Sequence, residues 1–441
     1  MSNIKKIIWN WFNGSEEGDT TEMSFFQRTA AETSLIQNQQ HSNSKSSSKK
    51  EKRNSRIPLN QPDDDDEELE DYDFYSSDHL DKIFNVVIEI QEEYDKKRKE
   101  EALRRQISLK TNSDKVPKAL LNPEVQRQIK KQKVYKPYFL VTLTIIQIAI
   151  MILEMAVNWI KLGSPIDLNK ENFNIMIGPS TSVLIHFGAR WVPCMRSGFE
   201  NEKISCIEGI EPYSNVTIDS KIVNVCKLSD MCGMGMTEYS VPNQWWRFIT
   251  PIFLHAGIIH IAANLFFQIR VGFQMERDFG SLRIFIIYTL CGIAGFMFGA
   301  EYSIQTPSVG CSGSLYGLIA CLLLDLILNW KLLIKPWKEL MKMLFVVIIS
   351  LGVGFLPFVD NFAHVGGFFT GIISGLIFLP SIKFNMKDRI IKKTITILCI
   401  PLLLLVMIFL NVSFYKSDAQ RCEWCKYANC LPINGWCDDM I

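Results

Sequence analysis

The chain has 441 residues, of which 48% are hydrophobic, and a formal charge of +1. This near-neutral balance favours no nucleic-acid partner. The averages combine a polar region up to Lys136 with repeated apolar stretches beyond it. Those stretches are long enough to cross a bilayer core of about 30 Å, which excludes a soluble globular protein and indicates a polytopic membrane protein.

Residues 1–137 form the polar region and contain the runs HSNSKSSSKKEKRNSR and PDDDDEELEDYD. Such runs are too polar to build a packed core, so we predict a disordered tail. The first residues, MSNIKKIIWNWFNG, contain too short an apolar run for a signal peptide, and no small-residue cleavage site follows. The first spanning helix is therefore expected to act as its own insertion signal.

The apolar stretches predict transmembrane helices, and hence an all-α, polytopic membrane helical bundle. The predicted spans cover residues 138–160, 248–269, 283–300, 311–329, 339–358, 363–380 and 390–412. A long loop at 161–247 separates the first two spans, and a cysteine-rich tail at 413–441 follows the last.

The loops between these spans differ in charge, which predicts their orientation. Lysine and arginine concentrate in the loops at 270–283, 330–342 and 381–393, whereas the loops at 301–309 and 359–362 contain neither. By the positive-inside rule, the basic loops and the N-terminal tail are cytosolic. The long loop and the C-terminal tail are then outside the cytosol. We therefore expect an integral protein of the secretory pathway or plasma membrane.

The cysteine distribution agrees with that orientation. Eight of the 12 cysteines fall in the long loop and the C-terminal tail: Cys194, Cys206, Cys226, Cys232, Cys422, Cys425, Cys430 and Cys437. The tail spacing CEWCKYANC also fits zinc ligands or a redox pair. Because the non-cytosolic side of the membrane is oxidising, we expect disulfides there and no metal site.

Three of the six histidines lie in the apolar region, where a polar side chain needs a partner or a function. His260 and Asn264 are four residues apart and share one helix face. An interhelical hydrogen bond is the simpler alternative for such a pair. His255 lies near the outer end of the same span, where packing or capping accounts for it. His364 begins the sixth span.

Two spans carry stripes of small residues, which let helices approach closely. The stripes are Gly310, Gly313 and Gly317 in the fourth span, and Ala363, Gly367, Gly371 and Gly375 in the sixth. Ser312 lies beside the first stripe and His364 beside the second, both near the outer ends of their helices. We therefore expect the hydroxyl and the imidazole to lie within hydrogen-bond reach, which is the arrangement of nucleophile and base in acyl transfer.

The surroundings of Ser312 fit this chemistry. The residue lies in the first turn of its helix, where free backbone N–H groups face a developing oxyanion. His260 and Asn264 would add donors, and Tyr316 would pack its ring against His364. No carboxylate of the second or sixth span lies at the depth that would orient the histidine, so we expect a Ser–His dyad and not a triad. A glycine-rich packing motif with a stray serine is the alternative reading.

These residues resemble the rhomboid family of intramembrane serine proteases over residues 171–380. The matching motifs are WWRFITPIFLHAGIIHIAANL, MERDFGS, VGCSGSLYG and AHVGGFFTG. The phrase IGPSTSVLIHFGARWVPCMR is similar to the eukaryotic secretory-pathway branch. The resemblance implies a six-helix rhomboid core at 138–380 and a seventh C-terminal transmembrane helix within 381–412, the six-plus-one layout of that branch.

The resemblance also implies roles for individual residues. Ser312 would be the nucleophile and His364 the general base and later the acid. His260 and Asn264 would line the oxyanion hole together with the backbone of Ser312.

Other residues would have supporting roles. Gly310 and Gly313 would shape the turn, Tyr316 would support the histidine, and Gly367 belongs to the pattern Ala-His-x-x-Gly. Glu276 matches a carboxylate that the family uses for structure at the cytosolic edge. Cys311 is a departure, since alanine is commoner before the serine.

The function implied is that of an intramembrane serine endopeptidase. It would cut the helices of single-pass transmembrane proteins within the lipid bilayer, near the non-cytosolic face, without a metal or cofactor. The main alternative is a catalytically silent rhomboid-like protein that binds or escorts membrane clients. Such proteins typically lose the serine or the histidine, and this chain keeps both.

A channel is a third reading, suggested by Glu154, Asn158 and Asp325. These three lie at opposite ends of the bilayer, so hydrogen bonding within the bundle explains them more simply.

Overall fold

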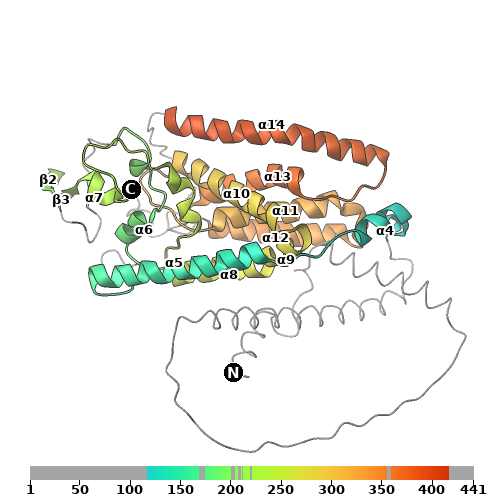
Figure 1. The fold of residues 1–441 in the computed structure, drawn as a ribbon, viewed down its shortest axis with the longest axis horizontal. Helices are drawn as coiled ribbons and strands as arrows, with labels where there is room; N and C mark the ends of the chain where they lie inside the picture. Colours follow the sequence, from blue (N-terminus) through green and yellow to red (C-terminus); the bar gives the residue numbers. More distant parts are fainter. Residues whose placement is uncertain are drawn as a thin grey trace, which may run out of the picture.

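The structure is a computed structural model that describes residues 117–416, except 168–173, 200–203, 207–209, 211, 219–220 and 355–358. These residues form a bundle of long helices with a smaller folded region at one end (Figure 1). The predicted fold class, a polytopic membrane helical bundle, is confirmed. The four C-terminal tail cysteines and residues 1–116 lie outside the described residues.

Four helices of the described chain are long and apolar enough to cross a membrane. They are α5 (Tyr138–Leu162), α10 (Ser281–Tyr302), α13 (Asn361–Phe378) and α14 (Met386–Lys416). The helix α11 (Ser312–Leu328) is apolar but shorter. Two further helices, α8 (Ile258–Phe267) and α12 (Pro336–Val353), complete the bundle. The order of these elements follows the predicted spans.

The second predicted span is wrong at its N-terminal side. The segment expected to be helical from residue 248 contains only short turns, η5 (Trp245–Phe248) and η6 (Thr250–Ile252), and α8 begins at Ile258. Pro251 has no N–H to continue a helix. The first N–H groups of α8 instead donate to the carbonyls of Ile177 and Met176 at 3.0 and 3.1 Å. The outer loop therefore satisfies the start of this helix.

The α8 helix continues into a π-helical turn, η7 (Gln268–Gly272), and then into α9 (Phe273–Phe279). Glu276 on α9 accepts hydrogen bonds from the backbone N–H groups of Phe139 and Leu140 at 2.7 and 2.8 Å. These N–H groups belong to the first turn of α5 and have no partner within that helix. The carboxylate of Glu276 thus caps α5 and joins the ends of two helices.

The predicted tail boundary at residue 137 is also wrong. The turn η3 (Lys118–Leu121) and the helix α4 (Pro123–Lys130) precede α5. Asn122 caps α4 by accepting from the N–H of Glu124. Val125 and Ile129 lie four residues apart on the buried face of α4, and both belong to the main core cluster. This short amphipathic segment folds because the bundle covers its apolar face.

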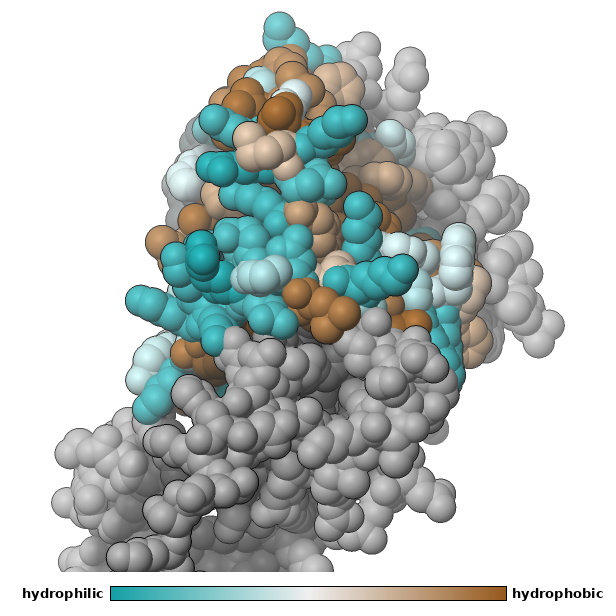
Figure 2. Space-filling model, turned by 90° about the vertical axis from the view of Figure 1, so that its right-hand side faces the viewer, coloured by the Kyte–Doolittle hydropathy of each residue, from teal (hydrophilic) through white to brown (hydrophobic). Residues whose placement is uncertain are grey.

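The end of the bundle that carries α4 is hydrophilic (Figure 2). The side chain of Gln128 on α4 pairs in both directions with the backbone of Lys383, between α13 and α14. Exposed basic residues flank the helix ends here: Lys130, Lys131, Lys133, Lys136, Lys335, Lys338, Lys383, Lys387 and Arg389. This is the end that the charge pattern assigns to the cytosol.

The opposite end carries a folded outer region within the segment predicted as the long loop at 161–247. It contains α6 (Thr181–Phe187), η4 (Val192–Cys194) and α7 (Leu228–Cys232). The strands β1 (Ile204–Ser205), β2 (Ser214–Ile218) and β3 (Lys221–Cys226) form an antiparallel sheet in the order β1-β3-β2. Disulfides join Cys194 to Cys232 and Cys206 to Cys226. The expected oxidation of the loop cysteines is confirmed.

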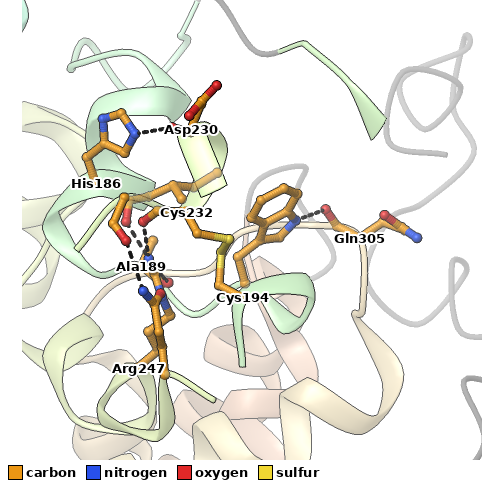
Figure 3. Close-up of a disulfide and its surroundings, with 11 residues drawn as sticks. His186, Ala189, Cys194, Asp230, Cys232, Arg247 and Gln305 are labelled. Atoms are coloured by element: carbon orange, nitrogen blue, oxygen red, sulfur yellow. Dashed lines mark hydrogen bonds between the residues drawn. A yellow bond between two sulfur atoms is a disulfide. The ribbon is translucent and has the colours of Figure 1, made fainter. Parts of the chain in front are cut away.

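Arg247 holds the parts of this outer region together (Figure 3). Its buried guanidinium donates to the carbonyls of Ile185, Ala189 and Cys232 at 2.7–2.8 Å. Burial lowers the pKa of Arg247 to about 9. The four hydrogen bonds that the guanidinium donates, including one to the Gln244 side chain, offset the cost of removing its charge from water. One residue thus fixes α6, α7 and the Cys194–Cys232 disulfide relative to one another.

Candidate active site

Ser312 and His364 form a direct hydrogen bond. The Nε2 atom of His364 lies 2.8 Å from the Oγ atom of Ser312. Ser312 is the first residue of α11, and His364 lies in the first turn of α13, so the pair sits where two helices begin. The histidine is 4% exposed and the serine is partly buried. The expected contact between hydroxyl and imidazole is present.

The two helices meet through glycine backbones, as the small-residue stripes predict. A Cβ atom placed on Gly367 would collide with the carbonyl group of Gly313, and one on Gly371 would lie 2.5 Å from the carbonyl oxygen of Gly317. Only residues without a side chain allow this approach. The backbone contact sets the distance between α11 and α13, and therefore the distance between Ser312 and His364.

Gly310 has a different position from the one the stripe suggests. It precedes α11, so it does not face α13, and its φ of +117° lies in a region that favours glycine. A Cβ atom there would lie 2.7 Å from Cε1 of His260 and 3.4 Å from Nδ2 of Asn264. Its N–H donates to the carbonyl of Pro251 at 2.9 Å. The turn before Ser312 is therefore packed directly against α8.

His260 and Asn264 thus lie beside the turn that leads to Ser312. Asn264 is 7% exposed, and its Nδ2 atom has no hydrogen-bond partner among the described residues. Nδ1 of His260 accepts from the N–H of Ala256 at 3.4 Å, which leaves Nε2 on the side of Gly310. Both side chains present potential donors close to the N-terminus of α11, where N–H groups are also free.

The ring of His364 is oriented by stacking. The rings of Tyr316 and His364 lie with centroids 4.1 Å apart and planes 16° apart. The Tyr316 hydroxyl donates to the carbonyl of Ser350 on α12 at 2.5 Å, which fixes the tyrosine. Nδ1 of His364 has no partner among the described residues. Stacking on Tyr316 and the contact with Ser312 are thus the interactions that orient this ring.

Cys311 is fully buried beside Ser312. Its Sγ atom lies 3.7 Å from Nε2 of His255, and the rings of His255 and His260 meet edge to face with centroids 5.4 Å apart. His255 therefore packs behind the turn that contains Cys311 and beside His260. This is the packing role that the sequence suggested for it.

An ion pair that the sequence does not predict lies next to this site. Nη2 of Arg190 lies 3.0 Å from Oδ2 of Asp360, with the two side chains 0% and 9% exposed. Burial lowers the pKa of the Arg190 guanidinium, and the charge of Asp360 counteracts this. Asp360 also caps α13, because its Oδ1 accepts from the N–H of Ala363 at 3.1 Å. An aspartate before an apolar helix is a capping signal, but nothing near Arg190 in the sequence announces its partner.

Two of the three residues that suggested a channel make hydrogen bonds within the protein. Oδ1 of Asn158 accepts from the N–H of Ser180 at 2.9 Å, and Asp325 accepts from the side chain of Asn329 at 2.9 Å. Glu154 is fully buried on α5. Among the described residues, no group of three or more His, Cys, Asp or Glu side chains could hold a metal ion.

Comparison with known proteins gives one family model and two kinds of relative. The model described as Rhomboid domain matches residues 242–381. Rhomboid-type serine protease 2 of Emericella nidulans is 32% identical over 386 residues, which cover 72% of this chain and 75% of that protein. Inactive rhomboid protein 1 of Danio rerio and that of Homo sapiens are each 37% identical over 207 residues, 47% of this chain and 24% of theirs.

Proposed function

Because this chain belongs to the rhomboid family and is an integral membrane protein, we propose that it is an intramembrane serine endopeptidase. It cleaves transmembrane helices of single-pass proteins near the non-cytosolic face of the bilayer. The observation that carries the proposal is the 2.8 Å contact between Nε2 of His364 and Oγ of Ser312.

The proposed reaction begins at that contact. Nε2 of His364 takes the proton of the Ser312 hydroxyl as Oγ attacks the carbonyl carbon of the scissile bond. The negative charge that develops on the carbonyl oxygen faces the N–H of Ser312 and the side chains of His260 and Asn264. The histidine then gives its proton to the leaving amine, and water hydrolyses the acyl-enzyme with His364 again acting as base.

The proposed orientation places the N-terminus in the cytosol and the Ser312 end outside it. The hydrophilic end of the bundle (Figure 2) and its exposed lysines support this, as does the pair of disulfides in the outer region. Such disulfides persist in the secretory pathway or at the cell surface. The tail cysteines would share that compartment.

A catalytically silent protein that binds membrane clients is the second candidate. It is favoured by the similarity to the inactive rhomboid proteins over 207 residues, 47% of this chain. The retained hydrogen bond between Ser312 and His364 favours the protease, since a silent protein has no need for it.

A co-expression assay separates these candidates. The protein is expressed with a panel of tagged single-span substrates, and wild type is compared with Ser312→Ala and His364→Ala. We expect cleavage by wild type alone, with both variants inserted at normal levels. Asn264→Ala is expected to retain slow cleavage, because one oxyanion donor contributes about 3 kcal/mol. Cleavage that survives in Ser312→Ala would exclude this serine as the nucleophile, and client binding without cleavage would favour the second candidate.

A further inference from the structure

Arg190 lies between α6 and η4 in the outer region, yet its side chain is fully buried at the end of the bundle where α11 and α13 begin. Its contacts reach two segments that are far from it in the sequence. One is the segment from Ser303 to Ser308, which leads from α10 toward Ser312. The other is Asp360, which begins the helix of His364.

The contacts with the first segment fix its path. The backbone N–H groups of Arg190 and Ser308 each donate to the carbonyl of the other residue at 2.9 Å. The guanidinium donates to the carbonyl of Ser303 at 2.6 Å through Nη1 and to that of Thr306 at 3.2 Å through Nη2. These hydrogen bonds satisfy two backbone carbonyls of the loop. The segment is thus held at both ends, four residues before Ser312.

The contact with Asp360 fixes the start of α13. Oδ2 of Asp360 faces Arg190, while Oδ1 accepts from the N–H of Ala363, and the backbone carbonyl accepts from the N–H of His364. The carboxylate packs so closely on Gly299 of α10 that a Cβ atom there would lie 2.6 Å from Oδ2. With one oxygen on the helix and one on the arginine, the carboxylate has little freedom to turn.

We propose that the Arg190–Asp360 ion pair is a positioning device that sets the alignment of Ser312 with His364. One guanidinium holds the loop before the serine and the cap of the histidine's helix in a single rigid arrangement. Neither side chain touches the reacting atoms, so both are positioning residues. This inference rests on the proposed function and adds to it a route by which the outer region determines whether the pair is aligned.

The geometry suits this role better than simple stabilisation. Loss of the contacts between Arg190 and the segment from Ser303 to Ser308 would let Ser312 shift. Loss of the Asp360 cap would let His364 shift. Small misalignments of reacting groups reduce turnover far more than they reduce binding. A purely structural ion pair would instead change stability and leave the turnover of the folded fraction unchanged.

The test separates the cap from the ion pair. Asp360→Ser keeps a good helix cap and removes the carboxylate that contacts Arg190. Asp360→Asn keeps the cap and the size of the side chain but removes its charge. Arg190→Lys keeps a positive charge and loses the forked donor geometry. Glu238→Gln is the matched control, because it breaks the exposed ion pair with Lys227 elsewhere in the outer region.

Three readouts are taken on purified protein whose thermal unfolding matches wild type. They are kcat and KM for a transmembrane substrate, the rate at which a fluorophosphonate labels Ser312, and the ¹⁵N-histidine signal of His364. For Asp360→Ser and Arg190→Lys we expect kcat and the labelling rate to fall together by about tenfold to a hundredfold, with KM changed less than about twofold. Asp360→Asn is expected to lie between these variants and wild type, and Glu238→Gln to match wild type.

The histidine signal makes the inference independent of substrate turnover. In Asp360→Ser, the His364 signal is expected to move toward that of Ser312→Ala, because the hydrogen bond between the two residues loosens. If wild type does not cleave any substrate but Asp360→Ser still shows this shift of the His364 signal, the protease function is overturned and the positioning role is supported. Unchanged kcat, labelling and signal in folded Asp360→Ser and Arg190→Lys would overturn the positioning role, as would an effect on KM alone.

Discussion

Gly310 shows at the scale of one residue how the site depends on backbone geometry. Its φ of +117° is costly for any residue with a side chain, and the space beside it is occupied by the imidazole of His260. The turn that presents Ser312 therefore combines a conformational requirement with a steric one. The two requirements can be tested separately, because Gly198 also has a positive φ but has nothing within 4 Å of an added Cβ atom.

Gly310→Ala is expected to reduce cleavage at least about tenfold, because the new methyl group displaces His260 from the proposed oxyanion hole. The matched control is Gly198→Ala. Gly198 has a similar φ of +110°, but nothing lies within 4 Å of an added Cβ atom. Both variants should lose about 1–2 kcal/mol of stability from backbone strain, whereas only Gly310→Ala should lose cleavage. Equal activities of the two variants, measured as kcat/KM, would contradict this reading.

The residues around the serine differ in how far the sequence alone could predict them. The contacts of Ser312 with His364, and of His364 with Tyr316, follow from helical spacing and depth, and both are present. Arg190 could not be predicted, since its partner Asp360 is 170 residues away and only the fold brings them together. Gly310 was assigned to a helix face, because the sequence does not show that α11 begins only at Ser312.

At the scale of helices, the contact between α11 and α13 is made by backbone and not by interlocking side chains. Gly313 and Gly317 lie against Gly367 and Gly371. In a bilayer there is little hydrophobic gain from joining two apolar helices, so close packing carries much of the association. The same contact sets the spacing of Ser312 and His364, which couples stability to the proposed activity.

Gly367→Ala is expected to separate the two helices, because the added methyl group meets the Gly313 carbonyl with no flexible side chain to yield. We expect a loss of about 1–3 kcal/mol of stability and a strong reduction of cleavage. Gly352→Ala on α12 is the control, since nothing lies within 4 Å of its added Cβ atom. Thermal unfolding in detergent and substrate cleavage measure the two effects. A Gly367→Ala protein as stable and active as Gly352→Ala would show that the helices are not held this closely.

The helices also show where hydropathy is a sufficient guide and where it is not. Long apolar stretches predicted α5, α10, α13 and α14 closely, because burying their backbone in lipid requires a helix. The stretch before Ile258 is equally apolar but is not helical. There Pro251 interrupts the helix and the outer region supplies hydrogen-bond partners, which a hydropathy pattern cannot register. The helix α4 is not predicted by hydropathy, because it has few apolar residues and is stabilised by packing them against the bundle.

At the scale of the whole molecule, the two ends of the bundle have distinct roles. One end is hydrophilic and basic, and α4 and the Glu276 cap tie its helices together. The other end carries the disulfide-linked outer region, and Ser312 and His364 lie beneath it at the helix starts. Arg247 holds the parts of the outer region together, and Arg190 connects it to Asp360 at the start of α13. Under the proposed function, substrate would therefore be cut close to the folded outer region.

Purified protein is reconstituted in liposomes with a single-span substrate, and the cut site is mapped by mass spectrometry. If the protein is an intramembrane serine protease, we expect one cut inside the substrate's helix near the non-cytosolic face, abolished by Ser312→Ala and by His364→Ala. Replacing the helix-breaking glycine or proline below the cut with leucine should slow cleavage, since the helix must unwind before a carbonyl is accessible. Cleavage that persists in Ser312→Ala would exclude this serine as the nucleophile, and no cleavage across a broad set of single-span substrates by folded wild type would exclude the protease function.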